Sequence, residues 1–440
     1  MKIAVLGGGI TGMTAAYEIS KKNHNVVLFE KQTDLGGLAS GFKDEKWKWP
    51  LEKNIHHLFS NDKDIISFAK KIGYRDIIFK TTKTGSYYPI TADFPKDYRT
   101  LLHSDMIRAP EGQVIPLDKP RDVLLFPYLG LISKLRIAIT IVFLKISPFF
   151  PFLYERINAE KFILFTMGKR TWNVLWRELF RKKFGKYAGI ILASFLWARI
   201  TKRTKKLGYF KGGFNSFINH LEGKLLERSV AVRKNTNINL IVKKGDQYLI
   251  NNEGFDVVVS TLPTPILIDA GINIFPAVYI NKLKKIKYMH AVSLILQTNK
   301  TIFDKYYWIN ILDRKNEIMG IVQHTNFMDR QNYNNNHIIY VYNYFPTDDI
   351  KVKLSKDQIY NFYIKNLKQI DPYIEKKIKK YDIFFGPFAQ PIFDKEFIKN
   401  KPDFITPAKN FFIANLDMTY PYDRGTNYAV KLGKEVSRFF

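Results

Sequence analysis

The chain of 440 residues contains no cysteine. It therefore has no disulfide framework, no thiolate nucleophile, no cysteine-ligated zinc and no cysteine-bound iron–sulfur cluster. Any redox chemistry must come from a bound cofactor. The absence of cysteine also fits a reducing compartment, so we expect a cytoplasmic protein, with peripheral attachment to the inner face of the membrane as the alternative placement.

Acidic residues are scarce: 40 Asp and Glu stand against 69 Lys and Arg, which gives a net charge of +29. Such a charge is typical of proteins that bind nucleic acid. The lysines are spread along the whole chain, however, and this distribution argues against a nucleic-acid groove. Solvated faces are the simpler interpretation, and an anionic membrane surface is the alternative partner.

Long uncharged apolar runs are also missing. The most apolar stretch, residues 124–154, is interrupted by Lys134, Arg136 and Lys145, so we expect no membrane-spanning helix. At helical spacing this stretch contains one apolar stripe, formed by Leu131, Leu135, Ile139, Val142 and Ile146. The stripe predicts a helix that lies in a membrane interface or lines an apolar substrate tunnel, and an ordinary core helix is the alternative.

Core-forming residues are plentiful. The chain is 46% hydrophobic and has 35 Phe and 25 Tyr, which excludes a disordered protein. At this length we expect two or three domains.

The N-terminus has the pattern of a βαβ unit. Residues 3–7 and 25–30 are apolar runs of strand type, and a helical pattern lies between them. The sequence G-x-G-x-x-G joins the first strand to the helix at Gly7, Gly9 and Gly12. In this context Gly7 permits a tight turn, Gly9 lets the backbone approach a pyrophosphate, and Gly12 allows the helix to pack closely on the strand.

An acidic residue, Glu30, closes the second strand 18 residues after the last glycine. There it can accept hydrogen bonds from ribose hydroxyls, so the segment predicts a dinucleotide site, the alternative being a structural turn that happens to contain three glycines. We assign the following residues to this site: Gly7, Gly9, Ile10, Thr11, Gly12, Glu30 and Lys31. Both FAD and NAD fit this fingerprint.

Two later features favour FAD. The doublet Gly36-Gly37, followed by Leu38, would let the chain pass close to the cofactor's diphosphate. Near the C-terminus a strand over residues 411–415 precedes a helix that begins near Thr426, which would aim a second helix N-terminus at the cofactor. No second G-x-G-x-x-G follows, so a separate nicotinamide domain is not expected.

The remaining chain mixes both element types. Residues 60–200 are predicted to be mostly helical, with one such segment over Lys161–Phe184, and another helix opens at Gly212-Gly213. Further strands are predicted at Ala231-Val232, Asn239–Val242, Tyr248–Ile250, Asp256–Ser260, Ala291–Gln297 and His337–Tyr344, with a helix near Asp357–Ile370.

The order of these pieces, from GGGITG at the start to IANLDMTYPYDRGTNYAVKLGKEV at the end, resembles the superfamily of FAD-dependent amine oxidases, protoporphyrinogen oxidases and phytoene desaturases, which also includes UDP-galactopyranose mutase. The resemblance implies an α/β fold: a Rossmann-type, GR2-like FAD-binding domain with an inserted mixed α+β substrate domain. It assigns residues 1–60, 205–270 and 400–440 to the FAD-binding domain. Residues 61–204 and 271–399 form the substrate domain, with a helical, membrane-facing part at 124–184.

The resemblance also extends the cofactor site. It implies that the strand at Val232 contacts adenine through its backbone and that the segment from Asp423 to Asn427 lies on the ribityl chain and flavin. The added cofactor-binding residues are Gly36, Gly37, Leu38, Val232, Asn415, Asp423 and Asn427. Two departures stand out: Leu38 replaces the arginine common in amine oxidases, and Asn415-Leu416-Asp417 replaces the expected Gly-Asp.

By the family layout, the segment with His56 and His57 runs beside the flavin, and these two histidines are the predicted catalytic residues. One of them could exchange a proton near neutral pH, although adjacent residues on an extended segment point to opposite sides and a hydrogen-bonded core histidine is the alternative. No third ligand suggests a metal site. Further candidates for the substrate pocket are Tyr87, Tyr88, Arg199, Gln323, His324, Asn326, Gln390 and Tyr420.

The apolar segment at 124–154 favours a hydrophobic small-molecule substrate, such as a porphyrinogen, an isoprenoid or a lipid-linked compound. We expect an FAD-dependent oxidoreductase that dehydrogenates it by hydride transfer to the flavin. The alternative is a UDP-galactopyranose mutase-like sugar-nucleotide isomerase, and a binding protein with a relic cofactor site is a third hypothesis.

Overall fold

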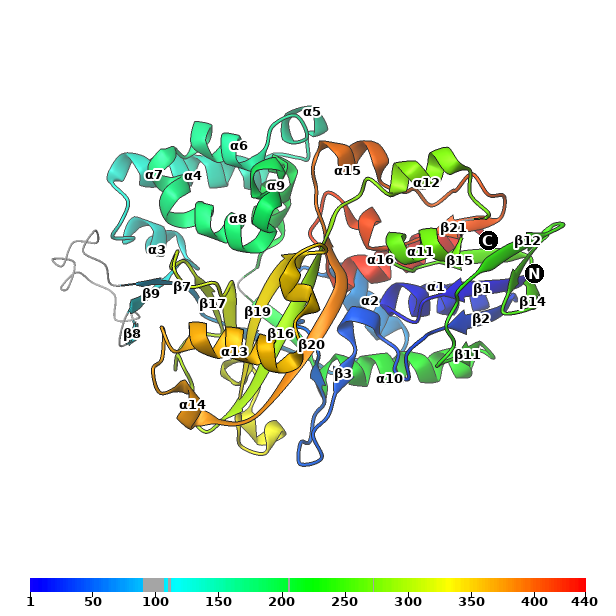
Figure 1. Ribbon diagram of the computed structural model, residues 1–440, viewed down its shortest axis with the longest axis horizontal. Helices are drawn as coiled ribbons and strands as arrows, with labels where there is room; N and C mark the ends of the chain where they lie inside the picture. The colour runs from blue at the N-terminus through cyan, green and yellow to red at the C-terminus, as the bar shows by residue number, and fades with distance from the viewer. Residues whose placement is uncertain (90–106, 110–111, 205, 272) are drawn as a thin grey trace.

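The structure, a computed structural model, describes residues 1–89, 107–109, 112–204, 206–271 and 273–440. Both termini lie at one end of the molecule, beside a five-stranded sheet, and a larger sheet with a group of helices above it forms the other end (Figure 1).

The five-stranded sheet is parallel and has the strand order β11-β2-β1-β15-β21. Its strands are β1 (Lys2–Leu6), β2 (Asn25–Phe29), β11 (Ala231–Arg233), β15 (Val257–Ser260) and β21 (Phe411–Ile413). In register, Val5 stands beside Leu28 and Val259. The central strands are continuous apolar runs because both faces of a parallel sheet are covered.

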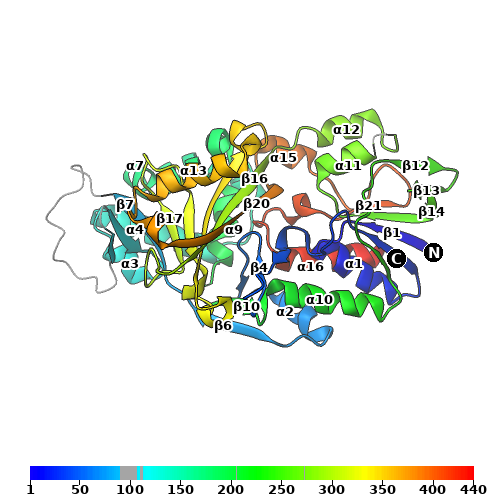
Figure 2. The same cartoon turned by 60° about the horizontal axis from the view of Figure 1, so that its bottom comes forward.

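Helices cover one face of this sheet and a small antiparallel sheet lies against the other (Figure 2). On the helical face lie α1 (Ile10–Ser20), α2 (Lys63–Lys71), α10 (Gly213–Leu226) and α16 (Thr426–Val436). On the other face lie β12 (Ile241–Lys244), β13 (Gln247–Ile250) and β14 (Glu253–Phe255), with α11 (Thr264–Ala270) and α12 (Ala277–Leu283). The Tyr248 and Phe411 rings, 5.5 Å apart, join the small sheet to β21.

The larger sheet has eight strands in the order β20-β16-β19-β18-β17-β7-β9-β8. They are β7 (Thr84–Pro89), β8 (Ile107–Ala109), β9 (Gly112–Pro116), β16 (Tyr288–Thr298), β17 (Trp308–Ile311), β18 (Gly320–Gln323), β19 (His337–Pro346) and β20 (Ile378–Pro391). Every pair is antiparallel except β7 with β17, where Thr84 stands beside Trp308. Helix α13 (Lys356–Leu367) packs on this sheet, and the Tyr363 hydroxyl donates to the Val292 carbonyl at 3.0 Å.

The shorter elements complete the chain. Two small sheets are formed by β3 (Gly41–Phe42) with β4 (Leu51–Glu52), and by β5 (Leu58–Phe59), β10 (Lys206–Phe210) and β6 (Ile77–Thr81). Two short helices are α14 (Ile374–Lys377) and α15 (Lys395–Asn400). The helical group comprises α3 (Pro120–Leu124), α4 (Leu131–Ile146), α5 (Pro151–Tyr154), α6 (Ala159–Thr166), α7 (Lys169–Thr171), α8 (Arg177–Phe184) and α9 (Ala193–Lys202).

Three expectations need correction. Residues 77–116 contribute strands β6 to β9, where a mostly helical region was predicted. The predicted helix Lys161–Phe184 is interrupted at Gly168, whose φ of 91° is left-handed, and a π-helical turn follows at 172–176. The predicted strand Asn239–Val242 forms two residues later, as β12.

Helix α2 lies within the segment assigned to the substrate domain, yet it packs on the cofactor side. The Phe68 ring contacts Tyr17 of α1 at 5.7 Å, and the backbone N–H of Asp64 donates to Asn427 of α16. Packing, rather than chain position, thus joins α2 to the N-terminal unit.

The apolar stripe of α4 faces outward, which shows that the core-helix interpretation was wrong. Its buried face is formed instead by Ile137, Thr140 and Leu144. The exposed fractions of the stripe are 83% for Leu131, 62% for Leu135, 61% for Ile139, 57% for Val142 and 76% for Ile146. A soluble helix normally places such residues in the core.

Candidate functional site

The turn between β1 and α1 has the conformation expected of a dinucleotide-binding turn. Gly7 has a φ of 101° and its N–H donates to the Phe29 carbonyl at 2.9 Å. A Cβ on Gly12 would lie 2.0 Å from the Gly7 carbonyl oxygen, so no other residue fits there. A Cβ on Gly9 would meet nothing nearer than the Gly37 Cα, at 4.0 Å, so space is open beside this residue.

Gly9 is also the N-cap of α1, with no side chain to cap the helix. The N–H groups of Ile10, Thr11 and Gly12 are in the first turn and have no acceptor within the helix. They therefore form an anion-binding helix N-terminus beside the open space at Gly9.

Glu30 is almost buried and holds this turn. One carboxylate oxygen accepts from the Gly8 N–H at 2.7 Å and the other from the Gln32 N–H at 2.9 Å. Each oxygen keeps a lone pair for a further donor, such as a ribose hydroxyl. Lys31, the next residue, is exposed.

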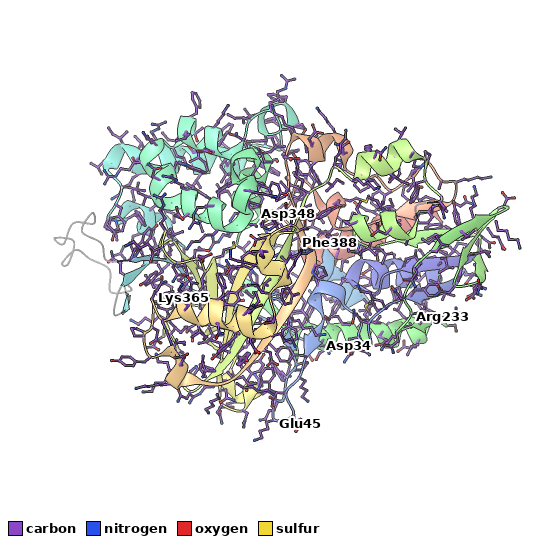
Figure 3. The ribbon with its side chains drawn as sticks, viewed as in Figure 1. Asp34, Glu45, Arg233, Asp348, Lys365 and Phe388 are labelled. Carbon is purple, nitrogen blue, oxygen red and sulfur yellow. The ribbon has the colours of Figure 1, made fainter. Side chains whose placement is uncertain are left out.

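The glycine doublet returns to the same turn. The Gly36 N–H donates to the Gly8 carbonyl at 2.8 Å, and a Cβ on Gly37 would lie 3.2 Å from the Gly9 Cα. In Figure 3, Asp34, two residues before the doublet, lies on the side of the five-stranded sheet that faces the eight-stranded sheet. Leu38 reaches that sheet, where it packs at Gly386 of β20.

Val232 lies on β11, the edge strand beside β2. The neighbouring Arg233 carbonyl accepts from the Glu30 N–H at 2.9 Å, so its backbone faces β2. Because successive backbone groups alternate along a strand, those of Val232 face the open edge. This is where the resemblance places adenine.

The predicted C-terminal residues lie beyond β21, and their side chains already have protein partners. Asn415 donates to the Leu262 carbonyl at 3.1 Å, and Asn427 accepts from Asp64 and Ile65 at the start of α2. Asp423 forms an ion pair with Lys183 at 3.0 Å. The N-cap residue of α16, Gly425, has no side chain to cap the helix, so the first-turn N–H groups of α16 are the groups of this segment left for an anion or a dipole.

Two residues near this edge were not predicted. The Thr261 hydroxyl donates to the Leu6 carbonyl at 2.9 Å and lies over Gly7. Asp417 is buried, which raises the pKa of its carboxyl to about 6, and it accepts from Tyr288 at 2.6 Å. The only sequence signal for Asp417 was its place two residues after Asn415.

The two histidines lie in different surroundings, as expected for neighbours on an extended segment. The His56 ring packs on Phe214, and its Nδ1 donates to the Asn54 carbonyl at 2.8 Å. The His57 ring packs on Trp308, and its Nδ1 lies 3.3 Å from the Tyr307 hydroxyl.

Burial lowers the pKa of His56 to about 4 and that of His57 to about 3. Both imidazoles are therefore neutral at pH 7, so neither can act as an imidazolium acid, and each is a weak proton acceptor in these surroundings. Their catalytic role stays a prediction.

Most other pocket candidates support the fold. Gln323 binds the backbone of Ile302 and Phe303, and Asn326 binds the carbonyl oxygens of Phe303 and Tyr306. Four more have structural surroundings: His324 hydrogen-bonds Tyr333, Gln390 donates to the Pro391 carbonyl, Tyr420 packs on Phe393, and Tyr88 packs on Phe126. Tyr87 is buried in the core beside Phe303. Arg199 differs, because its charge acts on the hydroxyl of Tyr342 on β19.

Within the described part of the chain, no group of three or more His, Asp or Glu side chains is arranged to hold a metal ion. No described helix combines the length and apolar character needed to cross a bilayer.

Comparison with known proteins identifies the family to which the chain is similar. The model of a protein family described as flavin containing amine oxidoreductase matches residues 10–437. A 4,4'-diapophytoene desaturase of Staphylococcus aureus is 36% identical over 78 residues, which is 18% of this chain and 15% of the desaturase. The matching segment is thus a small part of that relative.

Solved structures cover the whole chain. An oxidoreductase from Methanosarcina mazei has a TM-score of 0.73 at 15% identity, with all of both chains covered. Reduced UDP-galactopyranose mutase has a TM-score of 0.73 at 12% identity, covering all of this chain and 93% of the other. These likenesses confirm the predicted fold class, a Rossmann-type domain with an inserted substrate domain.

Proposed function

Because the chain belongs to the family of flavin-containing amine oxidoreductases, we propose that it dehydrogenates a hydrophobic substrate held in or at a membrane. The chain is an FAD-dependent oxidoreductase, as predicted from its sequence. The proposed substrate class comprises porphyrinogens, isoprenoids and lipid-linked compounds. The observation that carries this proposal is the exposed apolar face of α4.

The residues around the first glycine turn fit FAD. The open space at Gly9 and the N-terminus of α1 suit the diphosphate, and Glu30 keeps lone pairs for the ribose hydroxyls. The N-terminus of α16 suits the electron-rich side of the flavin. When bound, FAD supplies the hydride acceptor.

Of the two histidines, His56 is better arranged to accept the accompanying proton. Its Nδ1–H is held by the Asn54 carbonyl, which leaves Nε2 as the basic nitrogen. Burial keeps this imidazole neutral at pH 7.

The proposed membrane contact is the helical group. Two more exposed aromatic side chains follow α4 in the sequence. They are Phe152 of α5 and Phe165 of α6, which are 64% and 83% exposed. Arg136 of α4 donates to the Thr166 carbonyl at 2.9 Å, so the end of α6 is held against α4. Residues 124–170 include seven basic and two acidic side chains, which suits an anionic lipid surface.

The variant with both Leu131→Glu and Ile139→Glu is expected to lose vesicle binding. The wild-type protein should co-sediment with phosphatidylcholine vesicles containing phosphatidylglycerol at low salt, and binding should weaken as salt is added. The variant should bind at least about tenfold more weakly, because two apolar side chains are replaced by carboxylates.

The control is Val278→Glu, since Val278 of α12 is 82% exposed and α12 lies at the other end of the molecule (Figure 1). Equal binding by the double variant and the wild type, or no binding by either, would refute the membrane contact.

Anaerobic reduction tests the substrate class. The purified holoenzyme, incubated separately with a porphyrinogen, a phytoene-type isoprenoid and a lipid-linked quinol, is expected to lose its visible flavin absorption with one of them. Putrescine serves as the polar control. If the flavin stays oxidised with every apolar compound, the proposed substrate class is wrong; a protein that neither retains nor binds FAD would contradict the enzyme assignment itself.

A second candidate is a UDP-galactopyranose mutase-like isomerase. It is favoured by the guanidinium groups of Arg199 and Arg424, which no described carboxylate pairs with, because a sugar nucleotide carries a diphosphate. Conversion of a UDP-sugar by the pre-reduced protein, with no net loss of reducing equivalents, would replace the first proposal.

A further inference from the structure

A row of aromatic rings follows the eight-stranded sheet from His57 toward the C-terminal segment. Trp308 of β17 lies 5.9 Å from the His57 ring and 5.3 Å from Tyr342 of β19. Tyr344 is two residues further along β19, hence on the same face, with its ring 6.3 Å from Tyr342.

Cations from two other parts of the chain lie over the end of this row. The Arg424 guanidinium is 4.6 Å from the Tyr344 ring centroid and donates to the Ala389 carbonyl at 2.7 Å. Ala389 follows Phe388 of β20. Phe388 lies between the eight-stranded sheet and the five-stranded sheet (Figure 3). The Lys183 ammonium of α8 is 6.0 Å from the same ring.

Arg199 and Arg203 approach the row from α9. Arg203 follows the end of that helix and donates to the Thr84 hydroxyl at 2.8 Å. Burial raises the pKa of Tyr342, and the charges of Arg199, Arg424 and Arg203 oppose that rise, so all three arginines lie within electrostatic reach of this hydroxyl.

The cations of this cluster are only partly enclosed by protein. Burial lowers the pKa of Arg203 and lowers that of Arg424 to about 10, as expected of groups surrounded by protein. Yet the Arg203 side chain keeps 45% of its surface accessible, and Arg424 is only half-buried.

The local charge is not balanced by protein. Asp423 pairs with Lys183 at 3.0 Å, and Asp118 lies 3.8 Å from Arg203. Within the described ranges, no carboxylate pairs with Arg199 or Arg424. Uncompensated guanidinium groups in such surroundings are costly unless an anion binds them.

A buried hydroxyl points to the same conclusion. Tyr342 is 4% exposed, and its hydroxyl has no hydrogen-bond partner among the residues that the structure describes. The neighbouring Trp308 N–H acts on this hydroxyl but can only donate, and it donates to the Asn310 side chain at 3.1 Å, so the Tyr342 O–H still lacks an acceptor. A buried O–H without a partner is free to donate to a bound acceptor.

We propose that Lys183, Arg199, Arg203, Arg424 and Tyr342 bind a doubly negative phosphate or diphosphate group at one end of the substrate. Two unpaired guanidinium groups match two negative charges, and planar guanidinium groups suit phosphate oxygens. The inference rests on the proposed function and makes the substrate an amphiphile: its apolar chain comes from the membrane and its anionic head is held at this cluster.

The cluster is separate from the groups that suit the cofactor's diphosphate. Those groups lie at Gly9 and the start of α1, on the five-stranded sheet, whereas Tyr342 and Tyr344 belong to the eight-stranded sheet. An anion bound by the cluster would therefore not take the place of the cofactor's diphosphate.

Equilibrium dialysis of the holoenzyme against labelled farnesyl diphosphate tests the proposal, with FAD content measured on the same samples. The wild-type protein should bind this probe, inorganic diphosphate should compete, and farnesol should bind at least about tenfold more weakly. Arg199→Gln and Arg424→Gln should each weaken binding by at least about tenfold without loss of FAD. Arg75→Gln, which removes an exposed arginine elsewhere, should bind like the wild type.

The contrary outcomes are distinct. No binding by a protein that retains FAD, or binding that the two variants do not change, would refute the anion site and leave the FAD enzyme intact. The site would also be refuted if Arg424→Gln lost FAD while Arg199→Gln bound farnesyl diphosphate like the wild type. That result would mean that the Arg424 guanidinium serves the cofactor. Tighter binding of UDP than of farnesyl diphosphate would replace the lipid head group by a nucleotide. A wild-type protein without FAD would instead contradict the proposed function.

Discussion

The Gly12→Ala variant is expected to lose both its bound FAD and much of its stability. The added Cβ would lie 2.0 Å from the Gly7 carbonyl oxygen and 3.0 Å from the Thr261 hydroxyl. The nearer atom is backbone in a tight turn with positive φ, so it cannot rotate away as a side chain could. We expect a cost of at least about 3 kcal/mol, the upper range for overpacking, measured by urea unfolding, together with a colourless purified protein.

Two further glycine variants separate folding from cofactor binding. Gly9→Ala should keep the wild-type fold, because its Cβ meets only the Gly37 Cα at 4.0 Å and its φ of −69° suits alanine. It should bind FAD at least about tenfold more weakly, since the methyl group occupies the space beside the helix N-terminus. Gly223→Ala, in α10 with nothing within 4 Å of the new Cβ, should gain about 0.5–1 kcal/mol. A stable, yellow Gly12→Ala protein would contradict this account of the turn.

The N-terminal unit was predictable because its signals are local. The strand, glycine turn, helix and second strand lie within 30 residues, and each fixes the geometry of the next. The alternation of His56 and His57 was also predictable, since it follows from extended backbone alone. In both places the residues that decide the structure are neighbours in the sequence.

The eight-stranded sheet and the cation cluster were not predictable in this way. Strand β7 pairs with β17, so the partner of Thr84 is Trp308, and no local pattern encodes a pairing over that distance. Arg199 was singled out, but the fold alone brings it near Arg424 and Lys183, from different elements. The periodicity of α4 predicted its apolar stripe but not whether the stripe faces the core or the outside. A 3.6-residue period is the same for a core face and a membrane face.

The Glu52→Ala variant is expected to be among the least stable single variants of the chain. Glu52 is 1% exposed, and its carboxylate accepts from the Tyr209 hydroxyl at 2.6 Å and from the Phe214 N–H at 2.7 Å. Phe214 is in the first turn of α10, whose N-cap residue is a glycine without a side-chain cap. Truncation leaves two buried donors without acceptors and an empty volume, so we expect a loss of about 3–5 kcal/mol in urea unfolding.

Glu52→Gln changes the pH dependence rather than the packing. Burial raises the pKa of the Glu52 carboxyl to about 7, although hydrogen bonds from Tyr209 and Phe214 oppose the rise. The folded protein therefore holds this proton more tightly than the unfolded chain, whose glutamate has its ordinary pKa of about 4.3. The stability that Glu52 contributes is fully present below that ordinary value and is lost as the pH rises to about 7.

Glutamine cannot ionise, so the free energy of unfolding of the wild type minus that of Glu52→Gln isolates this group from the other titrating residues. This difference should fall by roughly 3 kcal/mol between pH 4.5 and pH 7 and stay constant at higher pH. A difference that is flat over this range would mean that Glu52 ionises in the fold at its ordinary pKa. A difference that rises with pH would mean that its ionised form is the one the helix N-terminus of α10 stabilises.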